Sequence, residues 1–117
     1  MKIKSFTFNC FQENSFVIYD DSKECIIIDP GCYSAQEEEE LEFFIKKTNL
    51  IPTKIINTHC HIDHILGNSF VIEKWKAPLY IHELEIPILE NAKEISSLYG
   101  FEEYKVSPYP NRFLKKG

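Results

Sequence analysis

The sequence lacks any apolar stretch long enough to cross a membrane, because no run approaches the roughly 18 residues that a bilayer requires. Its first ten residues, MKIKSFTFNC, alternate polar and apolar side chains and do not resemble a secretory signal. We therefore expect no membrane partner, and we expect the protein to be cytoplasmic.

Positive charge is also scarce. The chain has 13 Lys and Arg residues against 18 Asp and Glu residues, which gives a formal net charge of −5. Nucleic acids are bound through clustered Lys and Arg side chains, so this balance argues against DNA or RNA as a partner. The chain has no internal repeat, low-complexity segment or domain linker. Residues 1–117 therefore read as a single unit with a modest core.

No CxxC pair occurs, which argues against a cysteine-rich structural zinc site. The four cysteines, Cys10, Cys25, Cys32 and Cys60, are even in number and would permit two disulfides in a secreted protein. Without a secretory signal, four reduced thiols are the better prediction.

Strand-like and helix-like segments alternate along the chain. Residues rich in β-formers or apolar at every position predict strands at 2–9, 14–20, 23–31, 53–58 and 77–82, with the second and third paired as a hairpin. Helical spacing predicts helices over 34–48 and 65–75, and a weaker one over 83–100 that Pro87 divides. Residues 106–117 are expected to form a surface loop. This order predicts an α/β fold.

Four consecutive glutamates, Glu37–Glu40, have two possible explanations. Ser34 followed by Glu37 is a capping-box pattern, and Lys46 and Lys47 fall near the predicted helix end, where they favour the dipole. A solvated helix start therefore explains the acidic run better than a cation site does.

The densest chemical feature is NTHCHIDHILGN, residues 57–68. His59 and His61 lie two apart on an extended segment, so both imidazoles point the same way and can reach one ion at about 2.0–2.1 Å. Asp63 and His64 can address a second position nearby. The alternative is a helix cap at Asp63 with surface histidines, but three histidines in six residues favour metal. Imidazole and carboxylate together suit Zn, Fe or Mn better than Ca or Mg.

The segment THCHIDHILG resembles the T-H-x-H-x-D-H-x-x-G signature of the metallo-β-lactamase superfamily at every fixed position. Upstream, FQENSFVIYD and CIIIDPG resemble the opening strands of its glyoxalase II-like (hydroxyacylglutathione hydrolase-like) branch. The resemblance implies a four-layer αββα sandwich with a two-metal site between its sheets. Residues 1–117 would be the N-terminal αβ half of that domain, and we expect the chain to be truncated.

The resemblance also implies a chemistry. His59 and His61 would bind the first metal, and Asp63 and His64 the second, with Asp63 also counted as catalytic. Two zinc ions are expected, with Fe or Mn as alternatives, and they would activate a hydroxide that attacks a thioester or ester of a small-molecule substrate. Asp29 of the DPG turn would lie beneath the metal loop and accept a hydrogen bond from a ligating imidazole.

Other histidine and cysteine side chains near this motif are expected to be structural. Cys60 should point into the core, opposite to the imidazoles on either side. His82 closes a predicted strand, too early to be the third histidine of the family's first metal site.

The sequence departs from the family pattern after the histidine cluster. The family completes its site with two further histidines and a bridging aspartate, and none of these is present. We therefore expect weak metal binding and little hydrolysis from this chain alone. Without a second sheet, an inner face built from Phe6, Phe8, Val17 and Ile27 would be exposed, which predicts self-association or a partner chain.

Two other functions remain open. One is a mononuclear-iron persulfide dioxygenase, which shares the fold and the motif. The other is a non-catalytic fragment that binds only metal or a partner. The nucleases of the superfamily fit less well, because the chain is acidic and lacks a basic stripe.

Overall fold

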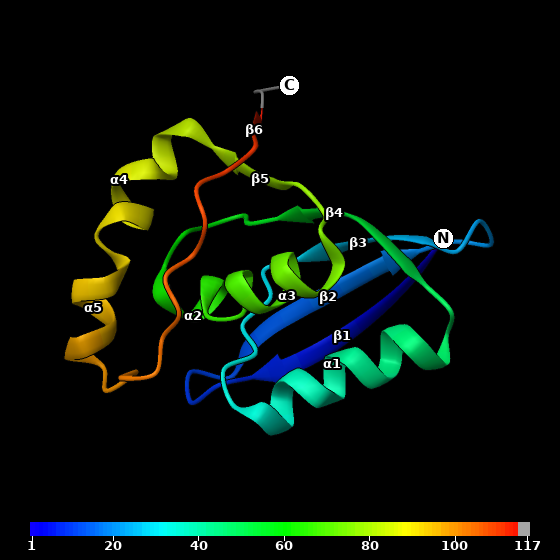
Figure 1. The fold of residues 1–117 in the computed structure, drawn as a ribbon, viewed down its shortest axis with the longest axis horizontal. Coiled ribbons are helices and arrows are strands. Elements are labelled where there is room, and N and C mark those ends of the chain that lie inside the picture. The colour runs from blue at the N-terminus through cyan, green and yellow to red at the C-terminus, as the bar shows by residue number, and fades with distance from the viewer. Residues whose placement is uncertain (115–117) are drawn as a thin grey trace.

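A computed structural model describes residues 1–114, which form one six-stranded sheet with the order β1-β2-β3-β4-β5-β6 (Figure 1). The strands are β1 (Lys2–Phe8), β2 (Glu13–Tyr19), β3 (Glu24–Ile28), β4 (Ile51–Ile56), β5 (Leu79–His82) and β6 (Arg112–Leu114). The pairs β1/β2 and β2/β3 are antiparallel, whereas β3/β4, β4/β5 and β5/β6 are parallel. The predicted hairpin and all five predicted strands are confirmed.

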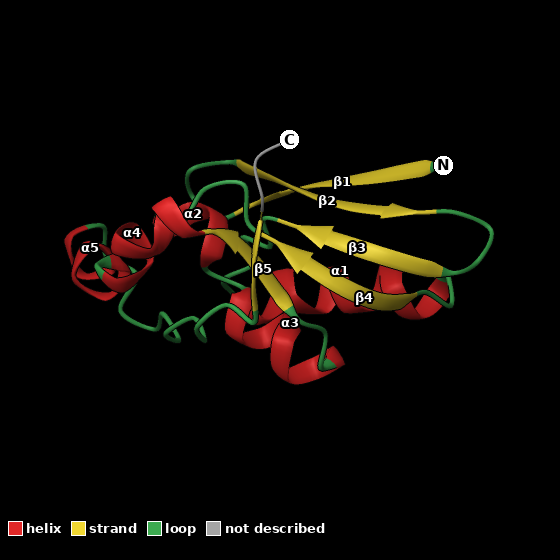
Figure 2. Cartoon of the chain, turned by 90° about the horizontal axis from the view of Figure 1, so that it is seen from above, coloured by secondary structure: helices red, strands yellow, loops and turns green. Residues whose placement is uncertain are grey.

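Helices cover one face of this sheet. They are α1 (Ala35–Lys47), α2 (Ile62–Ile65), α3 (Asn68–Trp75), the 3₁₀ turn η1 (Glu83–Glu85), α4 (Ile86–Glu90) and α5 (Ala92–Leu98). Figure 2 shows α1 and α3 beneath the strands, with α2, α4 and α5 gathered at one end. The α/β class is confirmed, and the described residues form one helical layer on one sheet.

The α1 helix begins with the predicted capping box. Ser34 Oγ accepts a hydrogen bond from the Glu37 backbone N–H at 3.1 Å, and the Glu37 carboxylate accepts from the Ser34 N–H in return. The same carboxylate also accepts from the backbone N–H groups of Asn9, at 2.7 Å, and Tyr33, at 2.8 Å. Glu37 therefore starts the helix and also anchors the β1–β2 loop to it.

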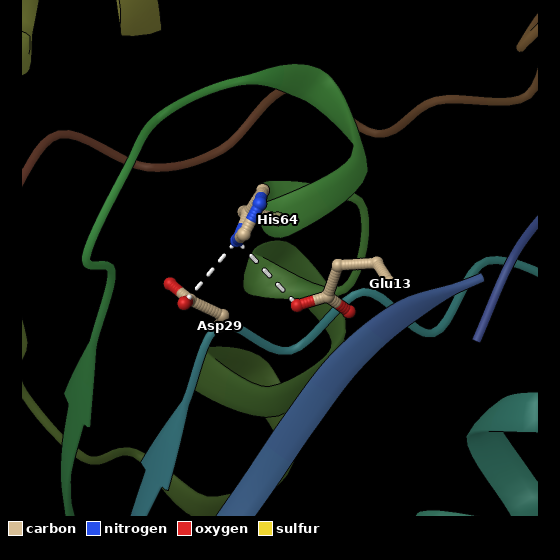
Figure 3. A group of neighbouring side chains, drawn as sticks. All are labelled: Glu13, Asp29 and His64. Carbon is tan, nitrogen blue, oxygen red and sulfur yellow. Dashed lines mark ion pairs between the residues drawn. The ribbon is translucent and has the colours of Figure 1, made fainter. Parts of the chain in front are cut away.

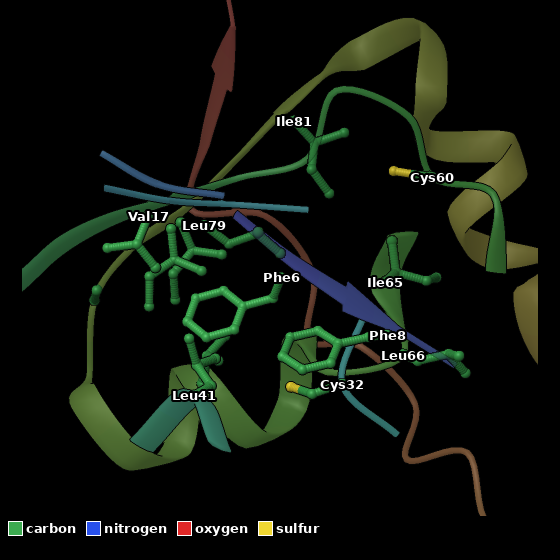
Figure 4. Close-up of a cluster of buried hydrophobic side chains, with 14 of the residues drawn as sticks. Phe6, Phe8, Val17, Cys32, Leu41, Cys60, Ile65, Leu66, Leu79 and Ile81 are labelled. Carbon is green, nitrogen blue, oxygen red and sulfur yellow. The ribbon is translucent and has the colours of Figure 1, made fainter. Parts of the chain in front are cut away.

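The core lies between the sheet and the helices α1 and α3. Leu41 and Ile45 of α1 and Val71 of α3 are buried with strand residues, among them Phe6, Phe8, Val17, Ile27, Ile55, Leu79 and Ile81. Figure 4 labels Leu41 together with Phe6 and Phe8 in this cluster. The prediction that Phe6, Phe8, Val17 and Ile27 form an exposed face is wrong, because each is at most 4% exposed. β3 is apolar at four consecutive positions, so alternation could not reveal which face the helices cover.

The opposite side of the sheet carries the other alternate residues. Register places Phe16 beside Ile28, Ile18 beside Ile26, and Ile28 beside Ile56, and these side chains are only partly buried. We call the surface formed by Phe16, Ile18, Ile26, Ile28 and Ile56 the open sheet face. No helix of the described residues lies on it in Figure 2.

Two predictions about the C-terminal third need correction. Pro87 does not divide a helix but lies in the first turn of α4, where its missing N–H has no partner to lose, and the break falls at Asn91. Residues 112–114 of the predicted loop pair with β5 instead, after Asn111 Oδ1 accepts from the Leu79 N–H at 2.9 Å. The last part of the predicted loop, 115–117, lies outside the described residues.

None of the helices within residues 1–114 combines the length and the apolar character needed to cross a bilayer.

Candidate metal centre

The histidine-rich loop connects β4 to α2 at the carboxyl end of β4, where α/β sheets commonly bind ligands. The rings of His59 and His61 stack with centroids 5.7 Å apart, and the rings of His59 and His64 lie 5.4 Å apart. Asp63 Oδ2 lies 3.5 Å from His64 Nε2. Since imidazole nitrogens bind zinc at about 2.0–2.1 Å, rings at these separations can share an ion or two adjacent ions. The structure brings all four predicted residues together.

Cys60 lies between two of these histidines but points away from them. Its side chain is fully buried in the core (Figure 4), whereas His59 and His61 are exposed. Burial raises the pKa of the Cys60 thiol to about 12, so it stays protonated and is a poor metal ligand. Its backbone N–H donates to Glu85 Oε1 at 2.9 Å, which ties the loop to η1. His82 is likewise structural, because its Nδ1 accepts from the Leu84 N–H at the start of η1.

Asp29 lies beneath the loop. Its backbone adopts a left-handed conformation with φ of 51°, which Asp tolerates better than most residues. One carboxylate oxygen accepts from the Thr58 N–H at 2.7 Å, and the other accepts from the Thr58 hydroxyl. That second oxygen also lies 3.2 Å from His64 Nδ1 (Figure 3). One carboxylate therefore contacts both ends of the loop.

These contacts assign the protons of two imidazoles. The single Thr58 hydroxyl proton goes to Asp29, so Thr58 Oγ1 accepts from His59 Nδ1–H, 3.1 Å away. His64 Nδ1 faces Asp29, which raises the pKa of His64, while its Nε2 lies on the side of Asp63. In both rings Nδ1 is the protonated nitrogen, and once His64 is neutral each ring presents the lone pair of Nε2. The proton positions are assigned from the hydrogen-bond network.

Glu13, at the start of β2, belongs to the same cluster and was missed in the sequence. Its side chain is almost fully buried, and Oε1 lies 3.5 Å from His64 Nδ1 with no hydrogen-bond partner among residues 1–114 (Figure 3). Burial raises the pKa of Glu13 to about 8, so it is mostly protonated at neutral pH. Ser15 Oγ, 2.8 Å from Oε2, accepts from the Gly31 N–H and donates to the Asp29 carbonyl, which leaves it able to accept a Glu13 proton.

A signal for Glu13 does exist in the sequence. In β2, Glu13 and Ser15 occupy the same alternate positions as Val17, which faces the core. An acid at an inward-facing strand position requires a polar partner. That signal could be used only once the buried face of β2 was known.

Known proteins resemble this chain in sequence and in fold. Residues 8–115 match the metallo-beta-lactamase superfamily. The chain belongs to that superfamily. It is 35% identical over 85 residues to the probable metallo-hydrolase YqgX of Bacillus subtilis, covering 73% of this chain and 38% of that protein. It is 32% identical over 111 residues to a hydroxyacylglutathione hydrolase of Mesorhizobium japonicum, covering 91% of this chain and 42% of that protein.

The fold of this metallo-beta-lactamase superfamily chain has solved counterparts. The crystal structure of TTHA1623 in a di-iron-bound form superposes with a TM-score of 0.85 at 30% identity, covering 97% of this chain and 55% of that one. A shorter match, 37% identity over 51 residues, is to the mitochondrial persulfide dioxygenase ETHE1 of Bos taurus, covering 44% of this chain and 19% of that protein. The chain thus spans about half the length, or less, of these relatives.

Membership of the superfamily implies a divalent metal, and the residues present fit one. Three imidazoles and Asp63 converge, and donor atoms of Glu13, Asp29 and His64 lie within 4.8 Å of one another. Within that group, the buried Glu13 Oε1 has no hydrogen-bond partner among the described residues, whereas His64 Nδ1 faces Asp29 Oδ2 at 3.2 Å. Nitrogen and carboxylate oxygen donors of this kind suit first-row divalent metals.

Replacing Thr58 by valine tests the proton assignment. Valine keeps the shape of threonine but has no hydroxyl to donate to Asp29 and to accept from His59 Nδ1–H. The His59 ring is therefore expected to lose its preference for a proton on Nδ1. Zinc affinity should fall roughly tenfold, the lower end of effects from residues that orient ligands. Nitrogen NMR of the imidazoles reads the tautomer, and calorimetry reads the affinity.

The matched control is Thr53→Val in β4, whose hydroxyl donates to the Cys25 carbonyl at 3.2 Å, away from the site. It should retain the wild-type tautomer and zinc affinity. An unchanged His59 tautomer in Thr58→Val would contradict the assignment.

Gly31 is required by close packing beside the site. A Cβ at this position would collide with Glu13 Oε2, would lie 2.5 Å from the Asp63 carbonyl oxygen and would lie 2.9 Å from Asn9 Nδ2. The Asp63 oxygen is backbone and cannot move without displacing the metal loop. We expect Gly31→Ala to lower the free energy of unfolding by about 2–3 kcal/mol, as overpacking does.

Urea unfolding measures this effect. Gly100→Ala is the control, because a Cβ there meets nothing within 4 Å and only the positive φ of 79° is strained. It should cost about 1–2 kcal/mol, the penalty for a left-handed backbone, with no loss of zinc affinity. Equal zinc affinity in Gly31→Ala and the wild type would show that the loop does not depend on this contact.

Proposed function

We propose that this chain is the metal-holding part of a metal-dependent hydrolase that acts on a thioester or ester of a small molecule. The observation that carries the proposal is the convergence of His59, His61, Asp63 and His64 above Asp29. Relatives named as a metallo-hydrolase and a hydroxyacylglutathione hydrolase support the same reaction class.

Each residue has a proposed role. His59, through Nε2, and His61 would hold one ion, while Asp63 and His64 would hold a second, with zinc as the proposed metal and iron or manganese as alternatives. Asp63 is also the proposed catalytic residue, because it lies at the substrate side of the loop and lines the adjoining cavity. Asp29 keeps the protons of His59 and His64 on Nδ1. When bound, a divalent metal supplies Lewis acidity, which polarises a carbonyl and acidifies water.

The proposed site is incomplete in this chain. Catalytic zinc sites usually have three protein ligands, and the first position here has two, His59 and His61. The chain covers 38% and 42% of the lengths of the two hydrolase relatives. We propose that residues outside the matched part supply the remaining ligands. We therefore propose that residues 1–117 alone bind metal weakly and hydrolyse little.

Calorimetric titration with zinc tests this proposal. The expected result is binding weaker than micromolar, with slow or undetectable hydrolysis of a hydroxyacylglutathione thioester. Adding the C-terminal half of a related metallo-hydrolase in trans should tighten binding and raise turnover. Sub-micromolar binding at two sites per chain would show that the incompleteness argument is wrong.

Two alternatives to a hydrolase can be tested, and one of them has support from a relative. The match to the bovine persulfide dioxygenase favours a mononuclear iron enzyme. Iron content, and oxygen consumption with glutathione persulfide, distinguish that enzyme from a hydrolase in a longer chain. A non-catalytic metal- or partner-binding fragment instead predicts no turnover even when the complementing half is supplied.

We further propose that the open sheet face mediates self-association. Five partly buried apolar side chains, defined above, form this face, and exposed apolar patches of this kind mark interaction surfaces. Sedimentation should detect dimers that Ile18→Lys converts to monomers. Dimers that persist in Ile18→Lys would contradict this proposal, as would a wild-type chain that is monomeric. The proposed partners are otherwise a small-molecule substrate, with no nucleic acid and no membrane, and the four unpaired thiols favour a cytoplasmic setting.

A further inference from the structure

A cavity of about 710 Å³ adjoins the metal loop. Residues 60–63 line it, so His61 and Asp63 border it. Residues of α4 and α5, including Ile88 and Ile95, and Phe11 of the β1–β2 loop complete its lining. The cavity therefore opens beside the residues that would hold the metal.

The lining is largely apolar, and its strongly polar side chains are those of His61, Asp63 and Asn91. Among the lining residues, His61 and Asp63 are the only ones with titratable side chains other than the buried Cys60 and the aromatic Tyr99, and none is Lys or Arg. The surrounding segment 83–98 carries four glutamates against one lysine. Away from the metal position, an anionic group would therefore meet no cationic side chain of the described residues and would meet a negative field instead.

Aromatic contacts make the cavity a fixed part of the fold. The rings of Phe11 and Tyr99 meet edge to face with centroids 5.2 Å apart, and Phe11 also lies 5.7 Å from Phe101. Phe101 in turn packs on Tyr33 at 5.0 Å, next to the start of α1. These pairs hold the end of α5 against the β1–β2 loop, since each such contact stabilises beyond its buried area.

We propose that this cavity binds an uncharged, apolar group of the substrate, an alkyl chain or ring, while the bond to be cleaved lies at His61 and Asp63. The inference rests on the proposed function and specifies its substrate class. The volume lies within the range of small-molecule pockets, and apolar pockets with a few polar groups at one end are typical of such sites. Glutathione carries two carboxylates and finds no partner for them in this cavity.

The test uses hexanamide as a neutral probe with an apolar tail, and acetamide as the same amide without the tail. Proton–nitrogen NMR of the full chain in chelator, without metal, is the readout. Hexanamide should shift the backbone signals of residues 60–63 and 88–99 at millimolar concentration, and acetamide should bind at least tenfold more weakly. Reduced glutathione should leave these signals unchanged. Equal binding of both amides, or shifts with glutathione, would overturn the proposal.

Variants locate the binding. Ile88, 36% exposed, can become lysine without disrupting the core, and Ile88→Lys should weaken hexanamide at least fivefold. Tyr99→Ser removes an exposed wall residue and should have the same direction of effect. Leu98→Lys at the end of α5 is the control, because Leu98 is 79% exposed and does not line the cavity. Unchanged hexanamide binding in both cavity variants would also overturn the proposal. These measurements contain no metal, so their outcome is independent of the zinc titration that tests the proposed function.

Discussion

Replacing His61 by alanine is expected to weaken zinc binding more than about 100-fold, beyond the effect of losing a residue that only orients a ligand. His61 is one of two imidazoles proposed for the first ion, so its loss leaves a single ligand there. The fold should be almost unaffected, within about 0.5 kcal/mol, because the side chain is exposed and does not cap α2. Calorimetry measures the affinity, and urea unfolding in chelator measures the stability.

The matched control is His82→Ala, the one histidine outside the cluster. Its ring caps η1, so its removal should cost about 1 kcal/mol of stability and leave zinc affinity unchanged. The two variants therefore separate opposite effects: one loses metal and keeps stability, and the other keeps metal and loses stability. Wild-type zinc affinity in His61→Ala would end the assignment of the loop as a metal centre.

Replacing Glu13 by glutamine is expected to flatten the pH dependence of stability in the metal-free chain. Burial raises the pKa of Glu13 from 4.5 to about 8, so the folded state holds a proton that the unfolded state has released. Its contribution is fully present below pH 4.5 and is lost as the pH rises to about 8. At about 1.4 kcal/mol per pKa unit, the wild type should lose roughly 3–5 kcal/mol over this window.

The Glu13→Gln variant stays neutral at every pH and should be more stable than the wild type above pH 8. His64 adds a smaller slope of the same sign, because Asp29 raises its pKa above 6.5 and that stabilisation is likewise lost as pH rises. Urea unfolding from pH 4 to 9 in chelator is the measurement. Glu24→Gln, an exposed carboxylate on β3, is the control and should keep the wild-type slope. A wild-type slope in Glu13→Gln would mean that Glu13 is ionised in the folded chain.

Local patterns predicted most of the secondary structure. The capping box at Ser34 joins residues three positions apart, and the alternation in β1 is a pattern of adjacent residues. A short stretch of sequence is therefore enough to predict both elements. The errors fell where the cause is distant. β6 forms only because Asn111 and the residues after it meet the edge of β5, and nothing within 106–117 carries that information.

The features of the metal loop also fall into local ones, which the sequence predicts, and distant ones, which it does not. The sequence by itself determined that three imidazoles and Asp63 occupy one turn after a strand, since their spacing compels nearby positions whatever the rest of the chain does. The tertiary structure alone decided which nitrogens face outward, because Asp29 reaches Thr58 and His64 from another strand. It also decided that Glu13 is buried beside them and that Phe6 and Val17 face the helices. Those outcomes depend on strand register and layer packing, which join residues far apart in the chain.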